Sequence, residues 1–315
     1  MEIIGYIASL VIGISLGLIG GGGSILTVPV LVYLFGINPV LATAYSLFIV
    51  GSTSLVGALP KYRQGLINLR TAFIFGLPAI GAVFATRKFI VPLIPDVVFH
   101  VGDFAVTKAI LMMLLFAVLM VFASVSMIRD KSEEEKINDD LLPFNGNDNR
   151  EEELLMVSAS SDLSASNVVV ADTATPTLIL EKEIIQEQKF NYPLILIEGI
   201  VVGILTGLVG AGGGFLIIPA LVLLSKLPMK QAVGTSLLII AAKSLIGFTG
   251  DLSNYTMDWK LLLSVTAIAI VGIVVGNWMT KKVSSEKLKK GFGWFVLVMG
   301  VYIIIKEIFF PGGGH

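Results

Sequence analysis

Long apolar stretches make up most of this chain, and they limit its fold more than any other feature. Eight of them are separated by polar segments. They span residues 3–35, 40–59, 71–94, 105–128, 193–224, 232–248, 261–279 and 292–310. Most are near the ~20 residues that an α-helix needs to cross a bilayer. None alternates polar and apolar residues in the short blocks of a membrane β-barrel. The sequence therefore predicts an all-α polytopic membrane protein.

Composition agrees with this class and excludes several kinds of site. Hydrophobic residues make up 55% of the 315 residues and charged residues only 14%. The chain has no cysteine, and His100 and His315 are too few to form a zinc site by themselves. It has no Walker A, nucleophile-elbow or HExxH sequence. We therefore expect no enzymatic activity, no metal, no cofactor and no nucleic-acid partner.

Charge divides the chain into three parts. Between Arg129 and Phe190 lie 15 of the 23 acidic residues, against six bases. The same region contains the low-complexity segment 158–167, whose composition buries too little apolar area to offset chain entropy. We predict a first membrane repeat at residues 1–128, an acidic and flexible linker at 129–191, and a second membrane repeat at 192–311.

The two membrane parts are copies of each other at an offset of 190 residues. Residues 13–29 align with residues 203–219, with their glycines and prolines in register. Downstream, serines keep the same offset at Ser46 and Ser236 and at Ser54 and Ser244. Repeated halves that each contain a glycine-interrupted apolar segment are typical of secondary transporters.

The first apolar segment of each repeat is too long for one upright helix and is interrupted by glycines at 20–23 and 212–214. It is either one tilted, broken span or a hairpin. A single crossing places ten Lys and Arg on each side of the membrane, whereas a hairpin places 15 on one side and five on the other. The positive-inside rule favours the hairpin. We expect two inverted repeats in the cell membrane, each a re-entrant hairpin plus three transmembrane helices. The linker is then cytoplasmic and both termini lie on the outer face.

Two hairpins that enter from opposite faces bring their glycine tips together near the middle of the membrane. Helices that begin at Ile25 and Phe215 direct free N–H groups toward this point, an arrangement that suits a small anion. The alternative is that the glycines only allow close helix packing. The candidate backbone site consists of Gly20, Gly21, Gly22, Gly23, Ser24, Gly210, Gly212, Gly213 and Gly214.

Lys243 is the most informative side chain, because no other charge lies between Lys230 and Asp251. A lysine at the centre of a membrane helix costs roughly 2.5–3.5 kcal/mol, so a bound anion is a plausible counter-charge. The alternative is that Lys243 extends toward the interface. Its repeat position is Thr53, so the two halves differ here. The serine pairs Ser46/Ser236 and Ser54/Ser244 are candidate hydrogen-bond donors to an oxyanion, or they bond locally to helix carbonyls.

The pattern Gly-x3-Gly-Leu-x-Gly-x-Gly-Gly occurs once in each half, followed by Pro29 and by Pro219. With the polar linker between the copies, this arrangement resembles the TauE/SafE family of sulfite exporters. The resemblance covers nearly the whole chain except the linker. It implies transport of a small sulfur-containing anion such as sulfite or an organosulfonate, often outward.

The leading hypothesis is a secondary transporter that exports a small oxyanion by alternating access at a central site. One alternative is an anion channel that uses the same site. Another is a membrane sensor or scaffold that transports nothing and acts through the linker.

Overall fold

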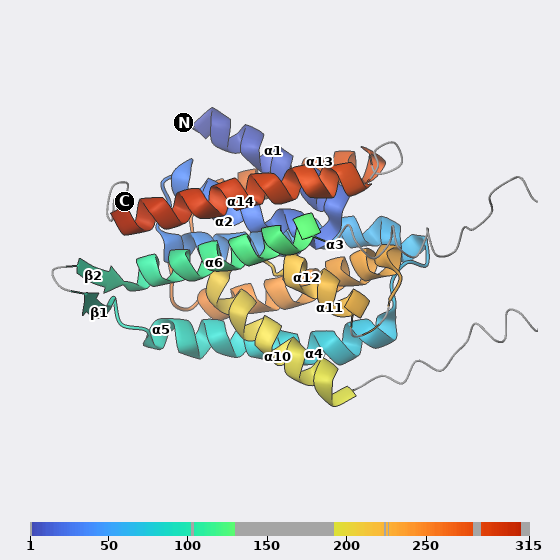
Figure 1. Ribbon diagram of the computed structural model, residues 1–315, viewed down its shortest axis with the longest axis horizontal. Coiled ribbons are helices and arrows are strands. Elements are labelled where there is room, and N and C mark those ends of the chain that lie inside the picture. Colours follow the sequence, from blue (N-terminus) through green and yellow to red (C-terminus); the bar gives the residue numbers. More distant parts are fainter. Residues whose placement is uncertain are drawn as a thin grey trace, which may run out of the picture. The chain divides into compact units, whose positions relative to one another are not determined.

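The computed structural model describes residues 2–101, 104–129, 192–223, 225, 227–279 and 285–309. Residues 130–191, which hold nearly all of the predicted linker, lie outside this set. Most of the described residues are helical (Figure 1). Within them, seven helical segments are long and apolar enough to cross a membrane, and Ile195–Val209 is a shorter apolar helix. The predicted all-α polytopic membrane fold is confirmed.

The first repeat begins with α1, the 3-10 helix η1 and α2, and continues with α3 and α4. A π-helical turn, η2, and a short α5 extend α4, and two antiparallel strands lead into α6. The bounds are α1 Glu2–Ile19, η1 Gly20–Leu26, α2 Thr27–Tyr33, α3 Pro39–Arg63, α4 Leu69–Ala85, η2 Thr86–Ile90, α5 Val91–Leu93, β1 Val97–Val101, β2 Phe104–Thr107 and α6 Lys108–Arg129. The strand pair was not expected from the sequence.

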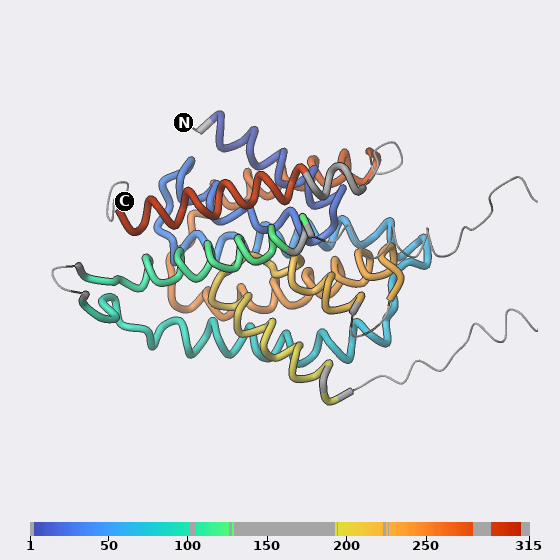
Figure 2. The backbone as a smooth tube through the Cα atoms, in the orientation of Figure 1, coloured from blue at the N-terminus to red at the C-terminus, as the bar shows by residue number. Residues whose placement is uncertain are grey.

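The second repeat has the same order of long helices, and its described residues include no strand, 3-10 helix or π-helical turn. Its helices are α10 Tyr192–Val209, α11 Gly214–Leu223, α12 Met229–Asp251, α13 Trp259–Met279 and α14 Ser285–Phe309. The backbone trace shows most of these helices lying roughly along one common direction with those of the first repeat, whereas α10 runs obliquely (Figure 2). The predicted spans are longer in the structure where a cap extends them: Asn38, for example, accepts a hydrogen bond from Val40 N and starts α3.

The first apolar segment folds back on itself as a hairpin. The rings of Tyr6 and Phe35 lie 5.4 Å apart, whereas one straight helix would separate these residues by roughly 45 Å. The stretch Ile3–Tyr33 is therefore a hairpin rather than one of the simple spans. Figure 1 shows a similar reversal between α10 and α11. Of the two interpretations of these segments, the hairpin is the one that the structure contains.

Hydrogen bonds between the repeats occur in related pairs. The amide of Asn68 donates to the hydroxyl of Thr235 over 3.0 Å, and the amide of Asp258 donates to the hydroxyl of Tyr45. Each partner in one bond lies 190 residues from its counterpart in the other. Asn68 and Asp258 also cap the helices that follow them, α4 and α13. The sequence offset thus extends to the tertiary contacts.

Helix packing also occurs in pairs related by the 190-residue offset. In each repeat, the first helix packs against the third long helix of the other repeat. α1 packs against α13, and α10 packs against α4. A Cβ built on Gly13 would lie 2.1 Å from Ala269 O, and one on the related Gly203 would lie 2.7 Å from Ala79 O. Glycine at both positions lets the helix backbones touch. The two repeats are therefore related by an approximate two-fold arrangement.

The outward faces of the helices are apolar. Phe73, Leu77 and Phe122 are 61%, 62% and 67% exposed, respectively. Large exposed apolar surface of this kind marks a membrane or interaction surface. The buried core is also largely apolar, but it contains in addition a set of hydroxyls and a few charges. Apolar surface outside and buried polar groups inside fit helices that are surrounded by lipid.

Candidate functional site

Each hairpin turns at glycines that adopt a backbone conformation which other residues rarely occupy. Gly20 has φ +76° at the start of the 3-10 helix η1. In the second hairpin, Gly210, Gly212 and Gly213 have φ +71°, +65° and +69°. Only glycine enters this left-handed region without a steric cost. The glycine runs are therefore required by the turns themselves, before any role in binding is considered.

The two turns touch each other through their backbones. A Cβ built on Gly21 would lie 2.4 Å from the Cα of Gly214, and one built on Gly214 would lie 2.1 Å from the Cα of Gly21. A Cβ on Gly212 would lie 3.3 Å from the Cβ of Ser24. All of these residues are buried. The structure thus brings together the two segments that the sequence singled out.

Lys243 reaches this meeting point from the middle of α12. Its side chain is completely buried, and Nζ donates a hydrogen bond to Thr206 Oγ1 over 2.8 Å. A Cβ built on Gly213 would lie only 2.8 Å from Nζ, so the ammonium lies directly against the second glycine turn. Lys243 therefore does not extend to the interface, and its burial agrees with the central position expected from the sequence.

The hydrogen-bond partner of the Lys243 side chain is a neutral hydroxyl, that of Thr206. Among the residues that the structure describes, no carboxylate lies within ion-pairing distance of Nζ. An ammonium has three N–H donors, and one of them is used by Thr206. A buried cation without an acidic partner is costly unless an anion accompanies it. The geometry is therefore that of a cationic point enclosed by backbone and hydroxyl groups.

The candidate serines divide into two groups. Ser24 donates to Gly21 O and Ser236 donates to Val233 O, so both hydroxyls bond locally. For Ser236 this is the alternative interpretation. The hydroxyls of Ser46, Ser54 and Ser244 are buried and have no hydrogen-bond partner among the described residues. Buried hydroxyls are normally paired. These three are therefore the serines available to a ligand.

Two related contacts hold the glycine turns against α3 and α12. A Cβ on Gly210 would lie 2.5 Å from Thr43, and one on Gly20 would lie 2.7 Å from Val233. Ser46 and Ser236 each follow the contacting residue by three positions, which places them on the same helix face. Ser46 and Ser236 therefore lie one helical turn after the residues of α3 and α12 that contact the glycine turns.

The helix starts differ from the sequence prediction. The helix expected from Ile25 begins at Thr27, because residues 20–26 form a 3-10 helix whose amides bond internally. The helix expected from Phe215 begins one residue earlier, at Gly214. Only α11 therefore begins directly at a turn, and there the amides of Leu216 and Ile217 already donate to Gly213 O. The symmetric arrangement of two helix dipoles was wrong for the first repeat.

Sequence reasoning missed three buried residues. Thr206, the partner of Lys243, aligns with Leu16 in the first repeat. Arg87 was counted as a loop base, yet it is completely buried with Asp251, at an Nη1–Oδ2 distance of 3.5 Å. A comparison of the repeats could have found Thr206, because a hydroxyl there replaces an apolar residue.

Lys108, counted with Arg87 on the outer side, is also largely buried at 9% exposure. Neither residue therefore counts as a loop base. Without them, the outer side retains fewer positive charges than the five counted from the sequence. The difference between the two sides, from which the hairpin was inferred, is therefore larger than the sequence count gave.

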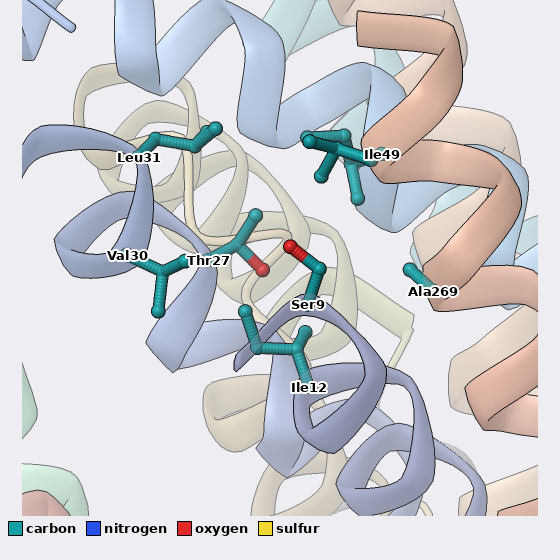
Figure 3. A pocket seen from close by; sticks show the side chains of 8 residues that line it. Ser9, Ile12, Thr27, Val30, Leu31, Ile49 and Ala269 are labelled. Atoms are coloured by element: carbon teal, nitrogen blue, oxygen red, sulfur yellow. The ribbon is translucent and has the colours of Figure 1, made fainter. Parts of the chain in front are cut away.

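A narrow recess lies in the first hairpin, away from Lys243. It is lined by Ser9, Ile12, Thr27, Val30, Leu31, Ile49, Val265 and Ala269. Figure 3 shows the hydroxyls of Ser9 and Thr27 directed toward each other between apolar side chains. The recess is too narrow to hold a water molecule. It is a packing defect rather than a ligand site.

No group of three or more metal-binding side chains occurs among the described residues. Lys243 places an ammonium against the second glycine turn, and Ser46, Ser54 and Ser244 are buried hydroxyls without a partner among the described residues. Ammonium and hydroxyl groups are hydrogen-bond donors of the kind that suits an anion.

Comparisons with known proteins agree with a transporter architecture. A model of the family described as sulfite exporter TauE/SafE matches residues 6–303. A probable membrane transporter protein of Xylella fastidiosa is 25% identical over 296 residues, which cover 93% of this chain and 91% of the relative. The probable membrane transporter protein YdhB of Bacillus subtilis is 23% identical over 294 residues, which cover 93% and 96%.

A probable membrane transporter protein of Methanocaldococcus jannaschii is 35% identical over a shorter stretch of 121 residues, covering 35% of this chain and 44% of the relative. No solved structure matches the chain. The family match extends from the first hairpin to the last helix, and the Xylella and YdhB relatives cover both repeats. The chain therefore belongs to the TauE/SafE family of membrane transporters.

Proposed function

We propose that this protein exports a small sulfur-containing oxyanion, such as sulfite or an organosulfonate, by alternating access. The binding site is the junction of the two glycine turns with Lys243, and Ser46, Ser54 and Ser244 supply further donors. The observation that carries the proposal is the completely buried ammonium of Lys243, which has a threonine as its hydrogen-bond partner. A bound anion supplies the missing counter-charge.

The two-fold arrangement of the repeats supports a mechanism in which the halves move about a central site. The related hydrogen bonds of Asn68 and Asp258 link the repeats on two equivalent sides. In Figure 1, α1 begins at the upper left of the helices and α10 at the lower right, which favours inverted repeats. Inverted repeats around a midplane site are typical of secondary transporters.

The direction of transport follows from charge. An anion that leaves a negatively polarised cell gains roughly 2.3 kcal/mol per charge per 100 mV. Export of an oxyanion therefore needs no co-transported ion. Outside the linker the chain carries 16 Lys and Arg against eight acidic residues, an excess that favours attraction of an anionic solute to the membrane repeats.

Uptake into proteoliposomes tests the proposal. The substrates are sulfite, thiosulfate, an organosulfonate and sulfate, compared between the wild type and Lys243→Ala. We expect saturable sulfite flux that Lys243→Ala abolishes, with membrane insertion unchanged. Lys260→Ala is the matched control, because Lys260 is an exposed base on the next helix. Wild-type flux from Lys243→Ala would remove the residue from the site.

Two further measurements separate the other functions. Electrical recording distinguishes a carrier from a channel, because a channel gives a unitary conductance far above carrier turnover. Deletion of residues 140–180 tests a role of the linker. If the membrane repeats export sulfite, the flux should survive this deletion. If the protein is instead a sensor that acts through the linker, the wild type should show no flux, and the deletion should abolish the response.

A further inference from the structure

A second buried cation lies outside the central site. Arg87 belongs to the π-helical turn η2, which continues α4 in the first repeat, and Asp251 is the last residue of α12 in the second. Both side chains are completely buried. π-helical turns within α-helices are frequent at functional sites. The pair therefore joins the two repeats at an irregular point of the membrane helices.

The contact between them is an ion pair without a hydrogen bond. Arg87 Nη1 lies 3.5 Å from Asp251 Oδ2, yet Nε, Nη1 and Nη2 have no hydrogen-bond acceptor among the described residues. Neither oxygen of Asp251 accepts a hydrogen bond there. A guanidinium carries five N–H donors in a planar fork, and buried donors are nearly always paired. Asp251 thus balances the charge of Arg87 but accepts no hydrogen bond from the guanidinium N–H groups.

The surroundings add positive charge. Lys108 is 9% exposed and lies close enough to Arg87 for the two charges to repel. The acid near Lys108, Asp96, is exposed, so water screens it. Burial and the nearby Asp251 raise the pKa of Tyr255, in the loop after α12. Tyr255 is therefore a neutral neighbour. Asp251 is the one buried carboxylate paired with Arg87 among the described residues, and Lys108 adds a second positive charge near the guanidinium.

Position links this cluster to Lys243. Asp251 follows Lys243 by eight residues on α12, a rise of about 12 Å along the helix axis. The cluster lies toward the 252–258 loop, which the charge count places on the outer face. The repeat counterparts of Arg87 and Asp251 are Asn277 and Lys61, so no equivalent acid–base pair exists at the other end.

We propose that Arg87 forms a second oxyanion-binding station, two helical turns beyond Lys243 toward the outer face. Asp251 acts as an internal counter-ion that faces the guanidinium after the solute has left. The planar fork of Arg87 matches two oxygens of a sulfite or sulfonate group, whereas Asp251 engages it by charge alone. This inference rests on the proposed function, because it assigns a second point on the path of the same anion.

Calorimetric titration of sulfite into the purified full chain tests the station. Asp251→Asn removes the competing carboxylate, so we expect sulfite to bind about tenfold more tightly and to turn over more slowly in proteoliposomes. In a Lys243→Ala background, residual sulfite binding is expected, and adding Arg87→Gln together with Asp251→Asn is expected to abolish it. The double variant Arg87→Gln/Asp251→Asn leaves no unpaired buried charge, so it is expected to fold even if one of the single variants does not.

Lys88→Gln is the matched control, since Lys88 is the exposed base next to Arg87, and it should leave sulfite affinity unchanged. Unchanged affinity in Asp251→Asn, with no residual binding in Lys243→Ala, would overturn the second station and leave the proposed function standing. A wild type that neither binds nor transports sulfite would instead reject the proposed function, and the station with it.

Discussion

Lys243 Nζ donates a hydrogen bond to Thr206 Oγ1 over 2.8 Å, from one helix of the second repeat to another. The counterparts of these residues in the first repeat are Thr53 and Leu16, which cannot form such a bond. The central site is therefore asymmetric, although the backbone around it follows a two-fold arrangement. An anion bound there meets a charge from one repeat and backbone from both.

Removal of the Thr206 hydroxyl tests this asymmetry. Thr206→Val keeps the side-chain shape and leaves Lys243 without its acceptor. Because a hydrogen bond to a charged group contributes about 1.5–3 kcal/mol, we expect sulfite flux to fall by about tenfold or more. The initial rate of uptake into proteoliposomes measures this. Thr249→Val, on the exposed face of α12, is the control; equal rates in both variants would show that the Thr206 hydroxyl is dispensable.

Contact between the glycine turns predicts a sharp difference between two Gly→Ala substitutions. Gly21→Ala places a methyl group 2.4 Å from the Cα of Gly214. We expect this variant to lose about 1–3 kcal/mol of stability through overpacking and to lose transport. Gly81→Ala meets no atom within 4 Å and should gain about 0.5–1 kcal/mol from helix propensity. Thermal unfolding in detergent measures both, and similar midpoints would contradict the contact.

The unpaired serine hydroxyls predict opposite effects on stability and on transport. Ser54→Ala and Ser244→Ala each remove a buried donor that lacks a partner among the described residues. An unsatisfied buried group costs about 1–3 kcal/mol, so we expect unchanged or higher stability. If the hydroxyls bind the anion, the apparent KM for sulfite should rise.

Ser124→Ala is the control for these variants. The Ser124 side chain is completely buried, and its hydroxyl donates to Val121 O over 2.7 Å. Its loss should leave the KM for sulfite unchanged. A KM that stays at the wild-type value in Ser54→Ala and Ser244→Ala would remove both serines from the site.

Orientation in the membrane is accessible because the chain has no cysteine of its own. Gln64→Cys and Ser253→Cys introduce single thiols at exposed positions in the loops after α3 and α12. The charge count places the first in the cytoplasm and the second outside. We expect a membrane-impermeant maleimide to label Ser253→Cys in intact cells and Gln64→Cys only after permeabilisation. The reverse pattern would contradict the predicted orientation.

Much of the architecture follows from the sequence because lipid permits few backbone arrangements. The stretch at 40–59 predicts a membrane helix, and α3 extends it to Pro39–Arg63 because Asn38 caps it and polar residues continue its last turn. The glycine interruption at 20–23, with the charge count, led to the hairpin that Tyr6 and Phe35 close. The strands β1 and β2 were missed, because four or five residues are too few for a clear pattern.

Lys243 indicated a site in the sequence because a charge within an apolar helix is energetically costly. Its burial at the glycine turns agrees with that interpretation. Arg87 gave no such signal. It lies beside Lys88 near the end of an apolar stretch, where bases normally meet water. Its burial depends on the π-helical turn that continues the helix and on Asp251 from the other repeat.

By itself, the sequence determined the helical membrane fold, the repeat and its offset, and the positions where the chain reverses. These follow from local hydropathy, charge and glycine, since a backbone surrounded by lipid must satisfy its own hydrogen bonds. Only the tertiary structure decided which distant groups meet: Gly21 with Gly214, Lys243 with Thr206, and Arg87 with Asp251. Such contacts depend on how the two repeats pack, and no local pattern in the chain records the packing of surfaces that lie far apart along it.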